Sequence, residues 1–415
     1  ERLRELDDNS VDSVVTDPPY GLSKEPDIRE VLSKWMAGEE YDHDHGGFMG
    51  KSWDSFVPHP DIWSEVHRVL KPGGHALVFA GTRTQDLMTI SLRLAGFEVR
   101  DVIEWLYFSG FPKSHDVGKA FDRRAGKLGI QSQGFSAAGD DGRKAELKQD
   151  LKYRSDYGYQ YEYKSELGRK YSGWGTALKP AHEPIIVVRK PLNDADTGRK
   201  LTVADCVEKY GTGAINIDAS RIGDEARTNA QKDFTAIHGN QYANGAYQPT
   251  TGEKAVEGRF PANCITLDSD AFYSKYFNIT PAELSKKASK KDRNSDWQGE
   301  EITLPLRDKT PNKGSTFKSA DVNGSGKLTN GTGKVAPTRN THPTVKPTDL
   351  MAWLVRLVTP PNGTVLDPFA GSGSTLVAAK REGFGYIGIE REAEYIEIIE
   401  ARTGTKAESE KEAIN

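Results

Sequence analysis

The run Asp17-Pro18-Pro19-Tyr20 directly follows an apolar stretch, Val11 to Thr16, which predicts a short buried strand. In open α/β sheets, ligands bind beyond the carboxyl ends of the strands. Two consecutive prolines stiffen the turn and lack N–H donors, so the turn presents acceptors: the Asp17 carboxylate and the Pro18 carbonyl. Two acceptors beside the ring of Tyr20 suit a planar ring that carries an exocyclic NH2 group. We therefore favour a turn that binds such a ring over a rigid loop with a chance aspartate.

A second run, Phe369-Ala370-Gly371-Ser372-Gly373, follows the predicted strand Thr364–Leu366 and Asp367, and it precedes a predicted helix, Ser374–Arg381. Glycines at such a turn allow a ligand to approach the backbone, and a helix N-terminus favours an anionic group. A further predicted strand, 386–389, ends at Glu390, whose carboxylate can accept hydrogen bonds from ribose hydroxyls. This arrangement predicts an adenosine ligand, although the dinucleotide pattern GxGxxG is absent and a simple tight turn is the alternative.

Alternating strand and helix patterns position both motifs. In the first half a helical face (Ile62, Val66, Val69, Leu70) ends at Lys71-Pro72-Gly73-Gly74, and it is followed by a strand at 76–80, a helix at 85–95 and a strand at 98–108. The C-terminal end repeats the pattern and closes with a helix at 393–401. This rhythm predicts an α/β protein with a doubly wound, mostly parallel sheet that is built from both ends of the chain.

The middle of the chain differs in composition. We divide the sequence into a catalytic half (1–112), an insertion (113–180), a returning strand (181–192), a target-recognition region (193–340), a cofactor half (341–403) and a tail (404–415). Lys and Arg exceed Asp and Glu by sixteen to ten over 113–190, and by eight to two over 307–346. Such stretches can hold a polyanion, although a solvated surface is the alternative. We expect the middle to be an inserted, irregular recognition region.

Composition limits the class of protein. The 415 residues carry a net charge of −4, and no apolar run is long enough to span a bilayer. Two cysteines, Cys206 and Cys264, exclude a disulfide framework and fit a reducing cytoplasm. His43 and His45 flank Asp44, but no further ligand pattern accompanies them, so we expect no metal.

Together, the two motifs resemble those of the S-adenosylmethionine-dependent amino-methyltransferases of DNA. DPPY resembles the catalytic motif and FAGSG the cofactor loop, and their order resembles the permuted β class, which is common among phage and restriction-modification enzymes. The segments GFMGKSWD (47–54), GFPKS (110–114), KPAHEPIIVVRKP (179–191) and HPTVKP (342–347) also look like those of this family. The resemblance implies a circularly permuted, Rossmann-like methyltransferase fold that acts on double-stranded DNA, with S-adenosylhomocysteine as the product.

The resemblance also implies roles for individual residues. The catalytic residues are Asp17, Pro18, Pro19 and Tyr20. Residues that bind the cofactor are Asp367, Phe369, Gly371, Gly373, Ser374, Thr375 and Glu390, with His342, Thr344 and Lys346 near its methionine part. From charge we further predict DNA phosphate contacts at Lys113, Lys286, Lys287, Lys290, Lys291 and Arg293, with a solvated face as the alternative.

The target atom and the reaction follow from the same residues. Relatives that act on cytosine N4 more often carry Ser at the first motif position, so Asp17 favours adenine N6. A base inside a duplex is out of reach, which implies that it is flipped out, with Tyr20 stacking on it. Methylation of RNA or of a protein amide, and a catalytically silent binder of cofactor or DNA, stay as alternatives. Many relatives dimerise, which leaves a homodimer open.

One departure from the family concerns the start of the chain. Family members usually begin with a short strand ending in Gly-Asp, whereas this sequence opens at Glu1, within the helix that normally follows. We therefore expect the sheet to lack one strand and the cofactor to bind more weakly.

Overall fold

The computed structural model describes residues 1–22, 24–43, 54–107, 114–126, 131–132, 160–227, 256–266, 278–279, 288, 293–294, 297 and 340–407. The chain forms two compact units, one made of Glu1–Tyr107 with His182–Asn415 and the other made of Phe108–Ala181. The first unit contains both chemical motifs of the sequence.

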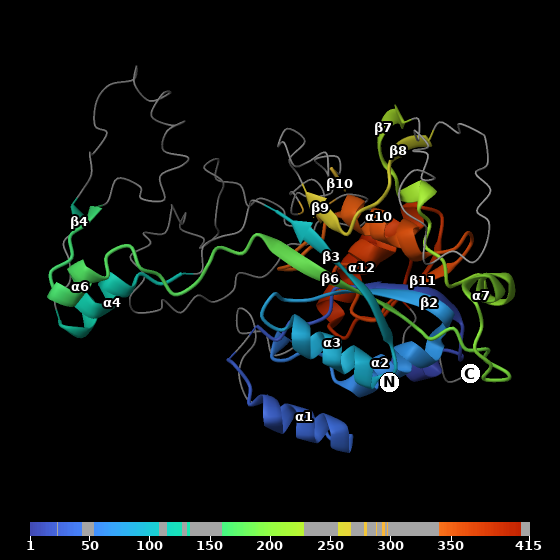
Figure 1. The fold of residues 1–415 in the computed structure, drawn as a ribbon, viewed down its shortest axis with the longest axis horizontal. Helices are drawn as coiled ribbons and strands as arrows, with labels where there is room; N and C mark the ends of the chain where they lie inside the picture. Colours follow the sequence, from blue (N-terminus) through green and yellow to red (C-terminus); the bar gives the residue numbers. More distant parts are fainter. Residues whose placement is uncertain are drawn as a thin grey trace, which may run out of the picture. The chain divides into compact units, whose positions relative to one another are not determined.

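An eight-stranded sheet organises the first unit, with the strand order β10-β9-β3-β6-β2-β1-β11-β12 (Figure 1). The strands are β1 (Val11–Thr16), β2 (Leu70–Phe79), β3 (Glu98–Leu106), β6 (His182–Arg189), β9 (Cys264–Thr266), β10 (Asn278–Ile279), β11 (Thr364–Asp367) and β12 (Gly385–Gly388). Five of its seven strand pairings are parallel, and the two made by β6 are antiparallel. The prediction of a mostly parallel α/β sheet is confirmed.

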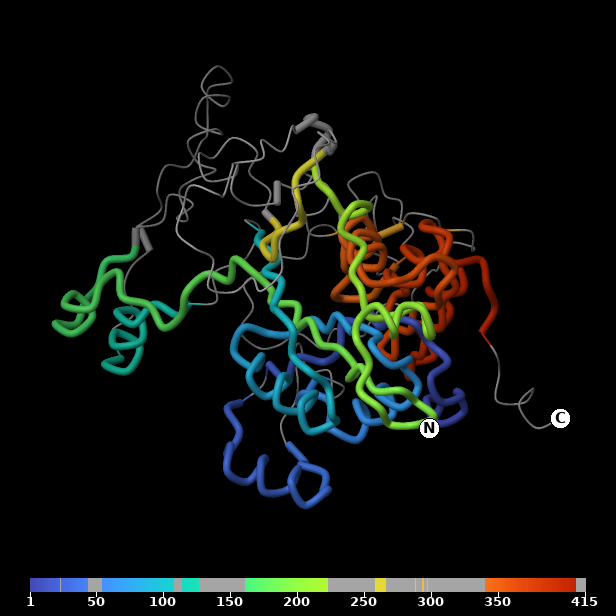
Figure 2. The backbone as a smooth tube through the Cα atoms, turned by 45° about the vertical axis from the view of Figure 1, so that its right-hand side comes forward, coloured from blue at the N-terminus to red at the C-terminus, as the bar shows by residue number. Residues whose placement is uncertain are grey.

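The centre of this sheet joins the two ends of the sequence. β1 pairs in parallel with β11, with Ser13 opposite Val365 and Val14 opposite Leu366. Figure 2 shows the blue N-terminal chain and the orange-red C-terminal chain running within the same body. On its other side β1 pairs in parallel with β2. Because parallel strands end at the same edge, the turns that follow β1 and β11 become neighbours.

Helices cover both faces of the sheet, as they must when central strands are apolar on both sides. One face packs against α1 (Ile28–Ala37), α2 (Pro60–Val69) and α3 (Gln85–Leu94), and the other against α10 (Thr348–Val358) and α11 (Ser374–Arg381). Figure 1 shows α2 and α3 below the sheet and α10 above it. Alternation along β1 divides its side chains between these layers, with Val14 in one core and Val15 in the other.

Smaller elements complete the first unit. They are η1 (Arg2–Glu5), α7 (Val203–Tyr210), η4 (Asp218–Ser220), the antiparallel pair β7 (Ile222–Arg227) and β8 (Val256–Arg259), and α12 (Ala393–Thr403). A Thr202–Asp205 capping box begins α7, and Gly211 ends it in the left-handed region. The range 193–340, which we expected to be irregular, therefore contains a helix and several strands.

The second unit is described by itself. It contains α4 (Val117–Arg124), α6 (Glu166–Lys170) and a short antiparallel pair, β4 (Gln131–Ser132) with β5 (Gln160–Tyr161). Asp122 is fully buried and accepts hydrogen bonds from the Lys164 N–H at 2.9 Å and the Ser165 N–H at 2.8 Å. This carboxylate therefore links α4 to the start of α6.

One boundary differs from the sequence prediction. We expected the segment Lys71–Gly74 to be a break after the helix, with a strand starting at residue 76, but β2 begins at Leu70. The Gly73 N–H donates to the Lys190 carbonyl at 3.1 Å, and the Lys190 N–H donates to the Gly74 carbonyl at 2.9 Å. Gly73 has a φ of 75°, a conformation that glycine adopts at little cost, so the irregular segment still pairs beside β6.

Packing at the β1–β11 centre predicts a large cost for truncating a side chain there. Leu366 on β11 is fully buried, so we expect Leu366→Ala to lower the free energy of unfolding by about 2–5 kcal/mol. Leu94→Ala is the matched control, because Leu94 is 46% exposed and should cost about 0.5 kcal/mol. Urea unfolding of the three proteins measures both values. Equal losses in the two variants would contradict the central position of β11.

Candidate active site

The two motifs of the sequence meet at one edge of the sheet. Thr16 ends β1 and Asp367 ends β11, and the Thr16 hydroxyl donates to Asp367 Oδ1 at 2.7 Å. The Thr375 hydroxyl, in the first turn of α11, donates to the Val15 carbonyl at 3.2 Å. The DPPY turn and the glycine-rich turn are thus tied together by buried hydrogen bonds from both directions.

Three hydrogen bonds hold the backbone of the DPPY turn. Asp54 Oδ1 accepts from the N–H of Tyr20 at 2.7 Å and from the N–H of Gly21 at 3.3 Å. The Thr84 hydroxyl, at the start of α3, donates to the Tyr20 carbonyl at 2.5 Å. Gly21 has a φ of 64°, and a Cβ there would lie 2.9 Å from the Val57 nitrogen. The turn is therefore rigid, and position 21 accepts glycine alone without strain.

A buried charge cluster surrounds the Asp17 side chain. Lys346 Nζ lies 2.5 Å from Asp17 Oδ2, 3.1 Å from Tyr20 Oη and 3.4 Å from Glu183 Oε2. The Tyr20 hydroxyl in turn donates to Glu183 Oε2 at 3.1 Å. Asp17 Oδ1 is buried and has no hydrogen-bond partner among the described residues. One carboxylate oxygen is thus held in place while the other keeps its accepting capacity.

Burial and neighbouring charges shift the ionisation of these groups. Burial raises the pKa of Asp17, partly offset by Lys346, while Glu183 raises it further. Burial lowers the pKa of Lys346, but the attraction of Asp17 and Glu183 prevails and raises it above its ordinary value. Burial, Asp17 and Glu183 together raise the pKa of Tyr20 well above its usual range. Lys346 is therefore a cation and Tyr20 a neutral hydroxyl.

The glycine-rich turn closes on Glu390. Gly371 and Gly373 have φ values of 53° and 77°, in the left-handed region. The Gly371 N–H donates to Glu390 Oε2 at 2.7 Å, and the Glu392 N–H donates to Glu390 Oε1 at 2.9 Å. A carboxylate has about four acceptor positions, and the Arg391 N–H also bonds this one, so Glu390 keeps acceptor capacity beyond its backbone partners.

Arg402, on α12, holds the same turn through hydrogen bonds. Its side chain is 1% exposed, and one guanidinium nitrogen donates to the Ser372 carbonyl at 2.6 Å and contacts Ser374 Oγ at 3.2 Å. A guanidinium presents several donors in a rigid fork, which suits it to fixing a turn and a helix start at once. Ser374, a predicted cofactor residue, therefore has its hydroxyl within this internal network.

His342 lies against the glycine-rich turn. A Cβ on Gly371 would lie 3.1 Å from His342 Nε2, and the imidazole packs edge-on to Tyr395 of α12, with ring centroids 4.4 Å apart. His342 Nδ1 lies 3.0 Å from the Thr344 carbonyl. The Arg293 guanidinium, which we predicted to contact DNA, donates to the His342 carbonyl. These contacts position the segment that leads to Lys346.

Other predicted residues fall outside the described part of the chain. Lys113, Lys286, Lys287, Lys290 and Lys291 lie there, and so do Asp44 and His45. The DNA contacts assigned to these lysines and to Arg293 stay predictions. Across the described residues, no group of three His, Cys, Asp or Glu side chains is arranged to hold a metal ion. Among the same residues, no helix is both long and apolar enough to cross a membrane.

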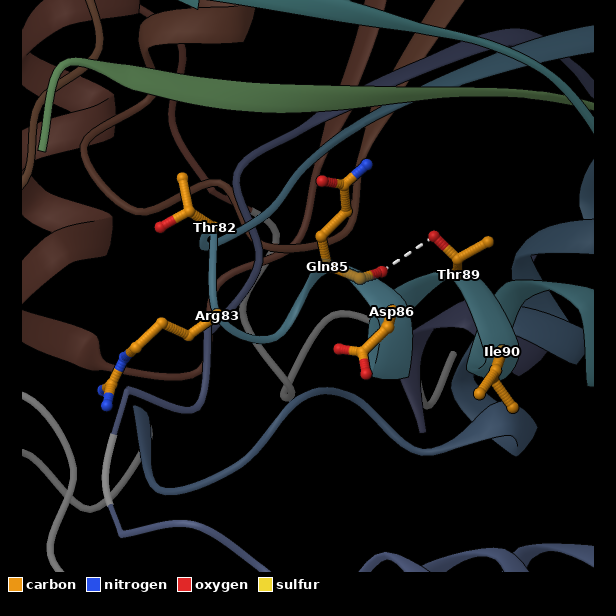
Figure 3. A pocket seen from close by; sticks show the side chains of 6 residues that line it. All are labelled: Thr82, Arg83, Gln85, Asp86, Thr89 and Ile90. Atoms are coloured by element: carbon orange, nitrogen blue, oxygen red, sulfur yellow. Dashed lines mark hydrogen bonds between the residues drawn. The ribbon is translucent and has the colours of Figure 1, made fainter.

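An open hollow of about 620 Å³ lies at the start of α3 (Figure 3). Its lining residues are Thr82, Arg83, Gln85, Asp86, Thr89 and Ile90. Thr84, between Arg83 and Gln85 in the chain, binds the Tyr20 carbonyl, so the hollow opens beside the DPPY turn. None of the predicted catalytic or cofactor residues lines it.

Comparison with known proteins places the chain in a family. Residues 11–401 match the sequence profile of the N6/N4-type DNA methylases. The chain belongs to the DNA methylase family. This membership confirms the resemblance drawn from the motifs and, with it, S-adenosylmethionine as the cofactor.

Individual relatives match this DNA methylase over short stretches. The type II methyltransferase M.HinfI of Haemophilus influenzae is 45% identical over 64 residues, which are 15% of this chain and 18% of the relative. YubD of Escherichia coli (strain K12), described as a methylase, is 56% identical over 54 residues, which are 13% of this chain and 24% of the relative. The chain thus spans about a fifth to a quarter of the length of these curated relatives.

A solved structure matches over most of its length at low identity. The PvuII DNA methyltransferase, described as cytosine-N4-specific, is 13% identical with a TM-score of 0.41, covering 99% of this chain and 85% of the other. The fold of the DNA methylase is established by its own strand order and strand pairings, independently of this likeness.

The residues of the glycine-rich edge fit an adenosine ligand. Glu390 keeps acceptor positions for ribose hydroxyls, and burial raises its pKa, as expected for a carboxylate that is enclosed rather than solvated. Phe369 packs beside Trp63, with ring centroids 5.8 Å apart. Asp367 and Thr375, by contrast, have their side chains bonded within the protein. The cofactor roles assigned to individual residues stay predictions.

Four residues of the site received no role from the sequence: Asp54, Thr84, Glu183 and Arg402. Asp54 and Glu183 lie in the segments 47–54 and 179–191, which resemble the family, but a resemblance of segments assigns no contact to either side chain. Thr84 and Arg402 carried no motif. Both act through atoms that only tertiary packing brings near the turns.

Asp367 predicts a measurable pH dependence of stability. Burial raises its pKa from 3.8 to about 6, against the lowering effect of hydrogen bonds from Thr16 and the Phe369 N–H. Between pH 4 and 6 the folded protein holds a proton that the unfolded chain releases, so stability from this group falls as the pH rises through that window. Asp367→Asn keeps an acceptor oxygen and cannot ionise, so this loss disappears.

We therefore expect the stability of Asp367→Asn relative to the unaltered protein to increase from pH 4 to pH 7 by up to about 3 kcal/mol. Urea unfolding at several pH values, without added ligand, measures it. Asp349→Asn, which alters an exposed carboxylate paired with Arg381, is the control and should follow the unaltered protein. If the free energy of unfolding of Asp367→Asn and that of the unaltered protein change with pH in the same way, the pKa of Asp367 is not raised in the folded protein.

Proposed function

We propose that this DNA methylase transfers a methyl group from S-adenosylmethionine to the exocyclic N6 of an adenine that has been flipped out of double-stranded DNA. The observation that carries the proposal is the buried Oδ1 of Asp17, an acceptor without a partner among the described residues, at the strand edge next to the glycine-rich turn. Membership in the N6/N4-type family supports an amino nitrogen as the target. The aspartate at the first position of DPPY supports adenine over cytosine.

The hydrogen-bond acceptors of the DPPY turn can increase the weak nucleophilicity of an aromatic amine. The lone pair of adenine N6 is delocalised into the ring, so the amine attacks poorly. Hydrogen bonds from N6–H to Asp17 and to the Pro18 carbonyl favour a pyramidal nitrogen, whose lone pair can point at a methyl carbon. Asp17 Oδ1 is suited to this because Oδ2 is already bound to Lys346.

The reaction itself is a single displacement. The amine nitrogen attacks the methyl carbon, the carbon–sulfur bond breaks, and its electron pair stays on sulfur. The alkylated nitrogen is acidic and loses one proton, so Asp17 need not be a strong base. When bound, the cofactor supplies the activated methyl group. The protein contributes the position of the base and the charges around it.

Rigidity of the DPPY turn supports this positioning role. Tyr20 is held through its N–H by Asp54, through its carbonyl by Thr84 and through its hydroxyl by Glu183. A tyrosine fixed at two backbone atoms and at its hydroxyl loses little further freedom when a base stacks on its ring, so it serves well as a stacking platform.

Removing the Asp17 carboxylate tests the assignment. We expect Asp17→Ala to abolish methylation, because the acceptor for N6–H is lost, while the affinity for duplex DNA stays within about threefold of the unaltered protein. Transfer of radiolabelled methyl groups to genomic DNA measures turnover, and fluorescence anisotropy with a labelled duplex measures binding. Asp12→Asn, at the opposite end of β1, is the matched control. Turnover retained in Asp17→Ala would contradict the role of this residue.

The methylated nucleoside identifies the target atom. Methylated DNA is hydrolysed to nucleosides, and mass spectrometry separates N6-methyl-2′-deoxyadenosine from N4-methyl-2′-deoxycytidine. We expect the adenine product. The cytosine product would replace the adenine assignment with the cytosine alternative, and the absence of any methylated base would favour a silent binder of cofactor or DNA.

A further inference from the structure

The three N–H groups of Lys346 have acceptors inside the catalytic cluster. An ammonium group has three donors and no acceptor. Asp17 Oδ2, Tyr20 Oη and Glu183 Oε2 lie 2.5, 3.1 and 3.4 Å from Nζ. The sequence placed Lys346 at the methionine part of the cofactor, but the structure directs its donors to the residue that we propose contacts the target base.

The surroundings of Lys346 keep it charged and fixed. Its side chain is 9% exposed, and its ammonium lies over the rings of Phe79 and Tyr20, 4.8 and 5.3 Å from their centroids. Cations are attracted to the faces of aromatic rings, and the attraction strengthens when water is excluded. Lys346 therefore has ion-pair, hydrogen-bond and ring contacts that all favour one position of the ammonium.

Glu183 gives the cluster a second negative charge. Its side chain is 15% exposed and lies on β6, whereas Asp17 follows β1 and Lys346 precedes α10. With Asp17 and Glu183 both ionised, the single cation between them leaves the cluster a net charge of −1. A buried ion pair stabilises a fold little more than apolar residues of similar volume would. The presence of this cluster therefore calls for a reason other than stability.

Resting on the proposed function, we infer that Lys346 is a positioning residue for Asp17 and that Glu183 anchors Lys346. Lys346 occupies Oδ2 of Asp17 and so presents Oδ1 to the amine hydrogen of the target base. Glu183 holds the ammonium from the opposite side and fixes the Tyr20 hydroxyl. The excess negative charge favours the positive charge that develops on the amine nitrogen as the nitrogen–carbon bond forms.

Steady-state kinetics on three variants test this inference. Lys346→Gln removes the cation, Lys346→Arg keeps a cation with a different shape, and Glu183→Gln removes the anchoring charge while keeping an acceptor for Tyr20. The matched control is Lys71→Gln. Lys71, on β2, forms an ion pair with Asp12 of β1, with an Nζ–Oδ1 distance of 2.6 Å, away from the catalytic cluster. The values of kcat and KM are measured separately for duplex DNA and for S-adenosylmethionine.

We expect kcat to fall by about 10- to 100-fold in Lys346→Gln, the range that loss of one charge-assisted hydrogen bond gives, with KM values changed less than about threefold. Glu183→Gln should lower kcat by about tenfold, because Lys346 still contacts Asp17. Lys346→Arg should recover part of the loss, and Lys71→Gln should leave kcat within about twofold.

A binding readout separates this inference from a cofactor role for Lys346. Isothermal titration with S-adenosylhomocysteine should give Lys346→Gln a Kd within about threefold of the unaltered protein. Much weaker binding with unchanged kcat would overturn the inference and restore the cofactor assignment. Equal losses of kcat in Lys346→Gln and Lys71→Gln would also overturn it, as they would indicate a general effect on the sheet.

The outcomes for the two proposals are distinguishable. If the unaltered protein methylates no DNA, the proposed function fails, whatever the variants do. If it does methylate DNA and Lys346→Gln keeps full kcat, the positioning role fails while the proposed function stands. Should Lys346→Gln not fold, Glu183→Gln and Lys346→Arg decide the matter, because both retain a partner for every buried charge.

Discussion

The parallel pairing of β1 with β11 is the constraint on which the site depends. Their residues lie some 350 positions apart, yet Ser13 faces Val365 and Val14 faces Leu366 at the centre of the sheet. Because both strands end at the same edge, the DPPY turn and the glycine-rich turn are brought together without any contribution from the intervening chain. Asp54, Thr84 and Glu183, which come from the intervening chain, then hold the DPPY turn at this edge.

Buried hydrogen bonds convert this adjacency into a fixed geometry. Thr16 to Asp367, Thr375 to Val15 and Arg402 to Ser372 join the two turns and the helices behind them. Each of these bonds lies out of contact with water, where a donor or acceptor left without its partner costs more than the bond itself contributes. Displacement of one turn would leave polar groups unsatisfied in the other. The two turns therefore behave as one rigid unit.

The sequence predicts the architecture better than it predicts the site. Apolar runs and glycine positions foretell β1, α3 and α11 closely, since burial and helix ends leave a local pattern. The start of β2 was missed because the pairing of Lys71–Gly74 beside β6 depends on contacts with a strand more than a hundred residues away. The contacts of Lys346 were not predicted, for the same reason. Its motif is local, but its partners are Asp17 in the turn after β1 and Glu183 on β6.

Charge balance links the architecture to the chemistry. Lys346 needs a counter-ion to remain buried as a cation, and a single carboxylate would suffice for that. Glu183 adds a second one, so with both carboxylates ionised the cluster keeps a net negative charge where an amine nitrogen would become positive. The fold supplies this arrangement through β6, the strand that runs antiparallel beside β2 and places Glu183 near the sheet edge. An antiparallel strand in a mostly parallel sheet brings the beginning of its sequence, rather than its end, to the catalytic edge. Glu183 is the second residue of β6, which explains why the acid lies before the apolar run and not after it.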